Sequence, residues 1–175
     1  MSHLTTTLRA GTAAALIGGF AFAGTVTASA DPTNTGNTSD INTLAGSLSK
    51  GYGLNNCTPQ AITGNQLARL TCGQSPDPAG PAQAKYILFT NGDDLAGSFK
   101  ASIKDDALTS CGDSGQSPTT WHQGSSTNSS GSLACGTYQN TAEIIWTTDA
   151  KNILSYIRAS NTDVPSLYQW WRANG

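Results

Sequence analysis

Four cysteines downstream of an export-type leader are the feature that most limits what this chain can fold into. They are Cys57, Cys72, Cys111 and Cys135. An even number of cysteines in an exported chain predicts two disulfides, and four cysteines permit three pairings. We favour Cys57–Cys72 with Cys111–Cys135, because each bond then closes a modest loop and joins neighbouring elements. No Cys-x-x-Cys pair of the kind typical of structural zinc sites occurs, so we expect no metal and no cofactor.

The first 30 residues have the pattern of a secretory signal peptide. Arg9 precedes an apolar run over residues 10–26, and Ala28-Ser29-Ala30 supplies the small-x-small pattern of a cleavage site. The run is shorter than the roughly 20 apolar residues that cross a bilayer. There is no twin arginine, so the general secretory (Sec-type) route is favoured. We therefore expect a secreted protein, extracellular or in the cell wall, with no membrane span after cleavage.

The remaining chain predicts one domain. Residues 31–39 are small, polar and aperiodic, and we interpret them as a disordered leader. Residues 40–175 are long enough for a single domain with its own core. Without Arg9, eight basic residues face eleven acidic ones, so the net charge is about −3. No basic stripe occurs, which argues against nucleic acid and against anionic membranes as partners.

The stretch 131–148 is the predicted centre of the fold. Alternating residues indicate two short strands, and the polar connection over residues 139–141 has the length of a hairpin loop. Residues 67–72, 86–90 and 152–159 predict three further strands. Three helices are predicted, each beginning at a residue that can cap it. The capping residue is Asp40 for the first helix, Asn91 or Asp93 for the second, and Asp163 for the third.

These elements predict an α+β fold. It consists of an antiparallel sheet of about five strands, with helices packed on one side and two disulfides.

The segment from Cys111 to Pro118, CGDSGQSP, resembles the nucleophile segment of chymotrypsin-like serine proteases. That chemistry needs an imidazole base for Ser114 and a carboxylate to orient the base. His122 is the one histidine beyond the leader, and it follows Ser114 by only eight residues. A turn beside a disulfide explains the match more simply, so we assign no catalytic residues. The alternative of a small secreted hydrolase would use Ser114, or carboxylates such as Asp113 and Glu143.

The four tryptophans are candidate binding residues. Aromatic side chains can line a groove for a carbohydrate or an apolar ligand, although their ordinary place is the core. The possible groove residues are Trp121, Trp146, Trp170 and Trp171. Trp121 lies in a Ser-, Gly- and Asn-rich segment. A second alternative function is therefore a cell-envelope interaction protein that uses this segment as its contact surface.

Residues scattered over 51–171 carry a family resemblance. They are Gly51, Tyr52, Cys57, residues 67–73, Ala84, Tyr86, Leu88, Phe89, Leu95, Phe99, Cys111, Ser117, Pro118, Trp121, Gly131, Leu133, Cys135, Gly136, residues 145–147, Leu167, Trp170 and Trp171. The pattern resembles a family of small exported actinobacterial domains, which stand alone or form the extracellular part of membrane Ser/Thr protein kinases. The resemblance implies a disulfide-stapled α+β domain and supplies no catalytic residues.

The sequence therefore favours a secreted, non-enzymatic domain of the binding or sensor type. Its partner would be an unknown ligand or a cell-envelope component, and we expect a monomer.

Overall fold

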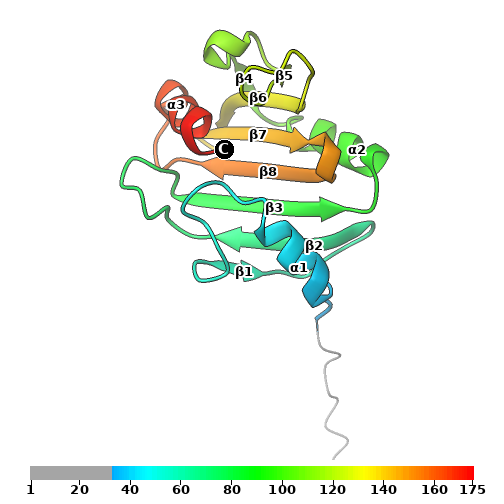
Figure 1. Ribbon diagram of the computed structural model, residues 1–175. Coiled ribbons are helices and arrows are strands. Elements are labelled where there is room, and N and C mark those ends of the chain that lie inside the picture. Colours follow the sequence, from blue (N-terminus) through cyan, green and yellow to red (C-terminus); the bar gives the residue numbers. More distant parts are fainter. Residues whose placement is uncertain (1–32) are drawn as a thin grey trace, which may run out of the picture. The chain divides into compact units, whose positions relative to one another are not determined.

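The computed structural model describes residues 33–175, so the predicted signal peptide and residues 31–32 lie outside it. Figure 1 shows helices packed against a twisted sheet. In chain order the elements are α1 (Thr38–Ala45), β1 (Cys57–Pro59), β2 (Gln66–Cys72), β3 (Gln83–Phe89), α2 (Gly92–Ser102), β4 (Ala107–Thr109), η1 (Gly112–Ser114), β5 (Thr119–Trp121), β6 (Gly131–Tyr138), β7 (Thr141–Thr148), η2 (Asp149–Lys151), β8 (Ile153–Arg158) and α3 (Val164–Asn174).

All the strand pairs are antiparallel, and the main path of the sheet runs β1-β2-β3-β8-β7-β6-β4, with β5 also paired to β6. The α+β class and the two disulfides agree with the sequence prediction, but the expected five strands are eight. The additional strands β1, β4 and β5 have three residues each. Such short segments show no readable alternation, and their strand conformation comes from pairing with β2 and β6.

The central hairpin forms as the sequence predicts. Gln139 and Asn140 join β6 to β7 with φ values of 49° and 62°, the left-handed conformation that two-residue hairpin turns require. The register places Leu133 opposite Trp146 and Cys135 opposite Ile144. Because side chains alternate along a strand, this register fixes which residues of β7 face each side of the sheet.

The two faces of the sheet are covered by different helices. The larger core contains Leu44 of α1 and Trp171 of α3, together with Trp146 of the sheet. A second core on the opposite face contains Phe99 of α2 and Ile145 of the sheet. The expectation that all helices pack on one side is therefore wrong. In β7, Ile144 and Ile145 are both buried, and adjacent apolar residues in a strand need cover on both faces.

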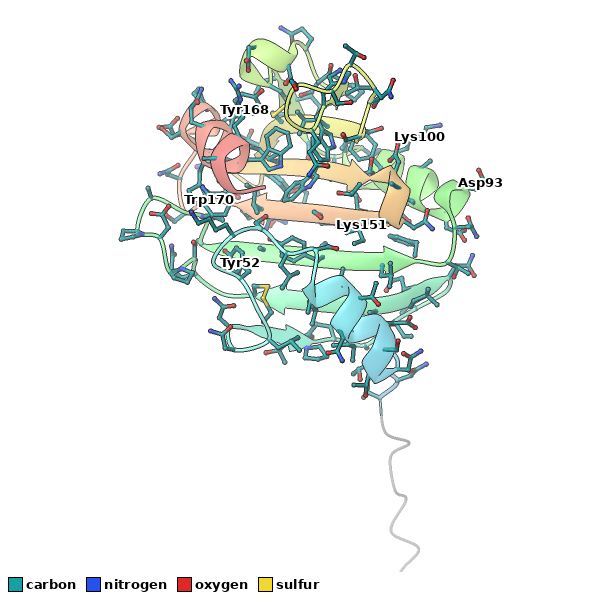
Figure 2. All side chains as sticks on the ribbon, in the orientation of Figure 1. Tyr52, Asp93, Lys100, Lys151, Tyr168 and Trp170 are labelled. Atoms are coloured by element: carbon teal, nitrogen blue, oxygen red, sulfur yellow. A yellow bond between two sulfur atoms is a disulfide. The ribbon has the colours of Figure 1, made fainter. Side chains whose placement is uncertain are left out.

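The disulfides have the pairing preferred from the sequence. Cys57–Cys72 joins β1 to β2, where Figure 2 shows a yellow bond between two sulfur atoms. Cys111–Cys135 joins the start of η1 to β6. The cysteine side chains are buried in the larger core. Each bond therefore links a short peripheral segment to a long strand of the sheet.

The start of the domain differs from the expected boundary. The α1 helix begins at Thr38, and the side chain of Asn37, rather than Asp40, caps it by accepting from the Asp40 amide at 2.8 Å. Gly36 makes an isolated bridge to Ala68 of β2. The bridge at Gly36 and the start of α1 thus lie within residues 31–39, which the sequence predicted as a leader. Within residues 33–175, no helix combines the length and apolar character needed to cross a membrane.

Candidate functional site

The candidate site lies on the face of the sheet against which α2 packs. It occupies the part of this face that α2 leaves uncovered. A helix is roughly 10–12 Å wide, whereas the seven strands of the main path span roughly 29 Å at their usual spacing of about 4.8 Å. The α2 helix therefore covers only part of this face. Its Leu95 and Phe99 pack over Ile87, Ile145 and Leu154. Beyond this cluster the same strands carry polar and charged side chains.

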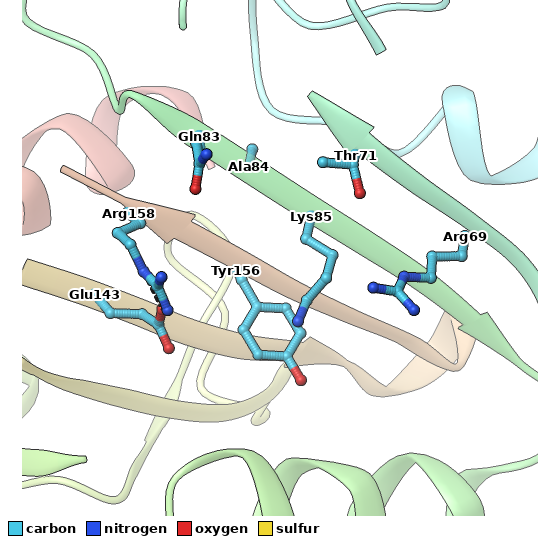
Figure 3. Close-up of a pocket in the computed structure, with 8 residues that line it drawn as sticks. All are labelled: Arg69, Thr71, Gln83, Ala84, Lys85, Glu143, Tyr156 and Arg158. Atoms are coloured by element: carbon cyan, nitrogen blue, oxygen red, sulfur yellow. Dashed lines mark hydrogen bonds and ion pairs between the residues drawn. The ribbon is translucent and has the colours of Figure 1, made fainter. Parts of the chain in front are cut away.

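These polar side chains line a cavity of about 190 Å³ (Figure 3). They come from four strands that are consecutive neighbours in the sheet, β2, β3, β8 and β7. The register pairs Thr71 with Lys85 and Lys85 with Tyr156. The lining residues are Arg69, Thr71, Gln83, Ala84, Lys85, Glu143, Tyr156 and Arg158. Strand pairing alone therefore brings together residues up to 89 positions apart in the chain.

Glu143 and Arg158 form the ion pair of this cavity. They lie opposite each other on β7 and β8, and the Nε and Nη2 atoms of Arg158 donate to Oε2 of Glu143 at 2.8 and 2.5 Å. The Glu143 side chain is only 6% exposed, so the pair is largely removed from water. The Arg158 guanidinium also lies over the Tyr138 ring, 5.0 Å from its centroid. Because Glu143 already balances the charge of Arg158, this arginine is poorly placed to bind an anionic ligand.

The other two cations of the cavity have no such partner. Lys85 Nζ lies 3.7 Å from the centroid of the Tyr156 ring, and the Tyr156 hydroxyl contacts Ser102 Oγ. Burial lowers the pKa of Lys85, and the nearby positive charge of Arg69 lowers it further. Among residues 33–175, Arg69 and Lys85 form no ion pair with a carboxylate. The buried Nε of Arg69 has no hydrogen-bond partner there. The two neighbouring cations are therefore not neutralised.

A second cavity of about 230 Å³ shares Lys85, Glu143, Tyr156 and Arg158 with the first. It adds Ser102, Tyr138, Asp105 and Asp106. Burial raises the pKa of Asp106 to about 6, with a further contribution from the charge of Glu143. Within the described residues, the buried Oδ1 of Asp106 has no hydrogen-bond partner. The two cavities therefore adjoin: Arg69 lines only the first, and Asp105 and Asp106 line only the second.

The environment of Asp106 predicts a pH-dependent stability. Because its pKa is higher in the folded state, folding favours the protonated form, and the free energy of unfolding should fall as pH rises from about 4 to about 6. In the Asp106→Asn variant the side chain cannot lose a proton, so this fall in the free energy of unfolding should not occur. We expect the variant to match the wild type near pH 4 and to exceed it by about 1 kcal/mol above pH 7, since the partial exposure of the site screens the effect.

Urea unfolding at pH values across this range tests the prediction. The control is Asp105→Asn, a change at an exposed neighbour, which should alter the free energy of unfolding by less than about 0.5 kcal/mol. A difference between Asp106→Asn and the wild type that is the same at pH 4 and pH 7 would contradict it.

The structure brings three of the four predicted groove tryptophans together. Trp171 packs edge-to-face against Trp121 and Trp146, with ring centroids 5.8 and 5.9 Å away. Trp170 lies apart, where its indole N–H donates to Asp77 at 2.9 Å. Trp146, Trp170 and Trp171 are buried, and Trp121 is half-buried. Trp121 and Trp171 line a separate hollow of about 350 Å³. A ligand groove lined by tryptophans therefore stays a prediction, and it depends on these two residues.

Ser114, Asp113 and His122 line that same hollow. The hydroxyl groups of Ser114 and Tyr168 lie 2.7 Å apart, and Tyr168 donates to Asp113 at 2.8 Å. This hydrogen bond and the adjacent Arg172 lower the pKa of Asp113. Among the described hydrogen bonds, Ser114 Oγ thus contacts a tyrosine and neither an imidazole nor a carboxylate. A serine hydrolase would need one of those two groups as its base.

Comparison with protein-family models, curated proteins and solved structures finds no match to this chain. The site therefore rests on geometry alone. Among residues 33–175, no group of three or more histidine, cysteine or acidic residues is placed to hold a metal ion.

From the sequence, Glu143 was expected only as a possible hydrolase carboxylate, and Arg69, Lys85 and Arg158 were not predicted as site residues. One signal was available, because Arg69 and Lys85 stand between apolar residues inside their strands, and Arg158 ends a strand that is mostly apolar. A charge on a strand of this kind indicates a face that is left open or holds a partner.

Proposed function

We propose that this chain is an exported, non-enzymatic binding domain and that its ligand is a small organic anion held by Arg69 and Lys85. The observation that carries the proposal is the convergence of these two cations, without a carboxylate partner among the described residues, on one cavity of about 190 Å³. The two disulfides are consistent with an oxidising compartment. The resemblance to extracellular sensor domains points in the same direction.

An anion would satisfy several features of the cavity at once. It would accept charge-assisted hydrogen bonds from the Arg69 guanidinium and the Lys85 ammonium, which are about twice as strong as neutral ones. It would also offset the repulsion that contributes to the low pKa of Lys85. Thr71 and Gln83 on the same wall offer a hydroxyl and an amide to orient it. A few polar groups in a partly apolar hollow are typical of small-molecule sites.

The test is a titration of the folded protein with acetate, succinate and phosphate, followed by amide chemical-shift changes. We expect the organic anions to perturb β2 and β3 around Arg69 and Lys85. Arg69→Gln or Lys85→Gln should weaken binding about 10-fold or more, because each removes a hydrogen bond to a charged group.

The matched control is Lys151→Gln. Lys151 is an exposed lysine of η2 that donates to Ser47, outside both cavities. This change should leave the affinity within about twofold. Equal affinities in all four proteins, or shift changes confined to another face, would refute the assignment of the site.

A further inference from the structure

We propose that the ligand is a zwitterion of dipeptide size, with its carboxylate at Arg69 and Lys85 and its ammonium group at Asp106. This inference rests on the proposed function and extends it from an anion to a ligand with two charged ends. The groove that it occupies is formed by the two cavities that share Lys85, Glu143, Tyr156 and Arg158.

The two ends of the groove have opposite charge. Arg69 and Thr71 line only the first cavity, whereas Asp105 and Asp106 line only the second. A dicarboxylate would place its second negative charge beside Asp106 and Glu143, and a diamine would meet Arg69 and Lys85. Both arrangements are repulsive, so a ligand with one charge of each sign fits the groove best.

Each end also holds a buried polar atom without a partner. Four buried side-chain atoms of residues 33–175 lack a hydrogen bond, and two of them are Arg69 Nε and Asp106 Oδ1. Buried polar groups are nearly always hydrogen-bonded in folded proteins, and exceptions need an explanation. A carboxylate would accept from the first atom, and an ammonium group would donate to the second. The unmet hydrogen bonds therefore match the two ends of the proposed ligand.

Glu143 and Arg158 both line the part that the two cavities share. The charges of Glu143 and Arg158 neutralise each other through two hydrogen bonds. The rings of Tyr138 and Tyr156 already lie against the cationic groups of Arg158 and Lys85. This part of the groove presents aromatic surface and a closed ion pair, which suits the uncharged spacer of a dipeptide.

The inference is tested by calorimetric titration with three probes: alanyl-alanine, N-acetyl-alanyl-alanine and alanyl-alanine amide. We expect the free dipeptide to bind at least 10-fold more tightly than either blocked form. Asp106→Asn should weaken the free dipeptide to the level of the acetylated probe while leaving the acetylated probe unchanged. Arg69→Gln should remove the preference over the amide. Asp93→Asn, at an exposed position in the first turn of α2, is the control and should change none of the affinities.

The outcomes separate this inference from the proposed function. If the acetylated and free dipeptides bind equally well through Arg69, the anion site stands and the ammonium contact is refuted. If neither peptide binds while acetate or succinate does, the zwitterion is likewise refuted. If no anion of any kind binds, both proposals fail. Asp106→Asn is expected to be at least as stable as the wild type, so a loss of binding in it cannot be attributed to unfolding.

Discussion

Replacing Trp146 by alanine is expected to lower the free energy of unfolding by about 4 kcal/mol. Trp146 is 3% exposed and lies on the central strand β7. Its ring packs edge-to-face against Tyr86 and Trp171, with centroids 6.3 and 5.9 Å away. Truncation would leave a large cavity between β3, β7 and α3, in surroundings too rigid to collapse into it. Equilibrium unfolding in guanidinium chloride, with the disulfides intact, measures the loss.

Two variants show whether this loss comes from packing. Trp146→Phe keeps an aromatic ring and should cost about half as much or less. Leu54→Ala changes an apolar side chain that is 49% exposed and should stay within about 0.5 kcal/mol of the wild type. A loss below about 1.5 kcal/mol for Trp146→Ala would show that the aromatic cluster does not support the sheet.

Removing the Cys111–Cys135 bridge is expected to cost about 3 kcal/mol, because the bond closes a loop of 24 residues that is otherwise free in the unfolded chain. The double variant Cys111→Ala with Cys135→Ala avoids a free thiol. Its effect should be local as well as global. Amides of η1 and β5 should lose protection from hydrogen exchange, since both segments lie inside the loop that the bridge closes.

The second bridge provides the comparison. Cys57→Ala with Cys72→Ala opens a 15-residue loop and should cost a similar amount, but loss of exchange protection should centre on β1 and β2. Cys111→Ser alone should leave Cys135 as a free thiol. Non-reducing peptide mapping checks the connectivity directly. A peptide that joins Cys57 to Cys111 or to Cys135 would disprove the pairing, and with it the placement of β1 and η1.

Much of the local structure could be predicted because its causes are local. Asp163 accepts from the Ser166 amide at 3.0 Å and starts α3, as its position before Pro165 predicts. The Gln139-Asn140 turn and the alternation of Ile144 with Ile145 specify the hairpin and its faces. The capping of α1 was misjudged by three residues, since Asn37 and Asp40 both have side chains that can cap a helix.

The candidate site could not be predicted in the same way. Arg69, Lys85 and Asp106 are far apart in the sequence, and nothing local to any of them indicates the others. They lie around one groove because β2 pairs with β3 and because α2 ends beside the open part of the sheet. The tryptophans were conspicuous in the sequence, but three of them are buried in core packing.

The sequence by itself determined the five long strands, the three helices and the presence of two disulfides, with a preference for one of three pairings. These features depend on composition, spacing and contacts between neighbours in the chain. Only the tertiary structure decided the three short strands, the position of α2 on the second face and the groove beside it. Each of these features depends on pairing between strands that are distant in the sequence. The register of that pairing is decided by the burial of both faces of the whole sheet, and no single segment determines it.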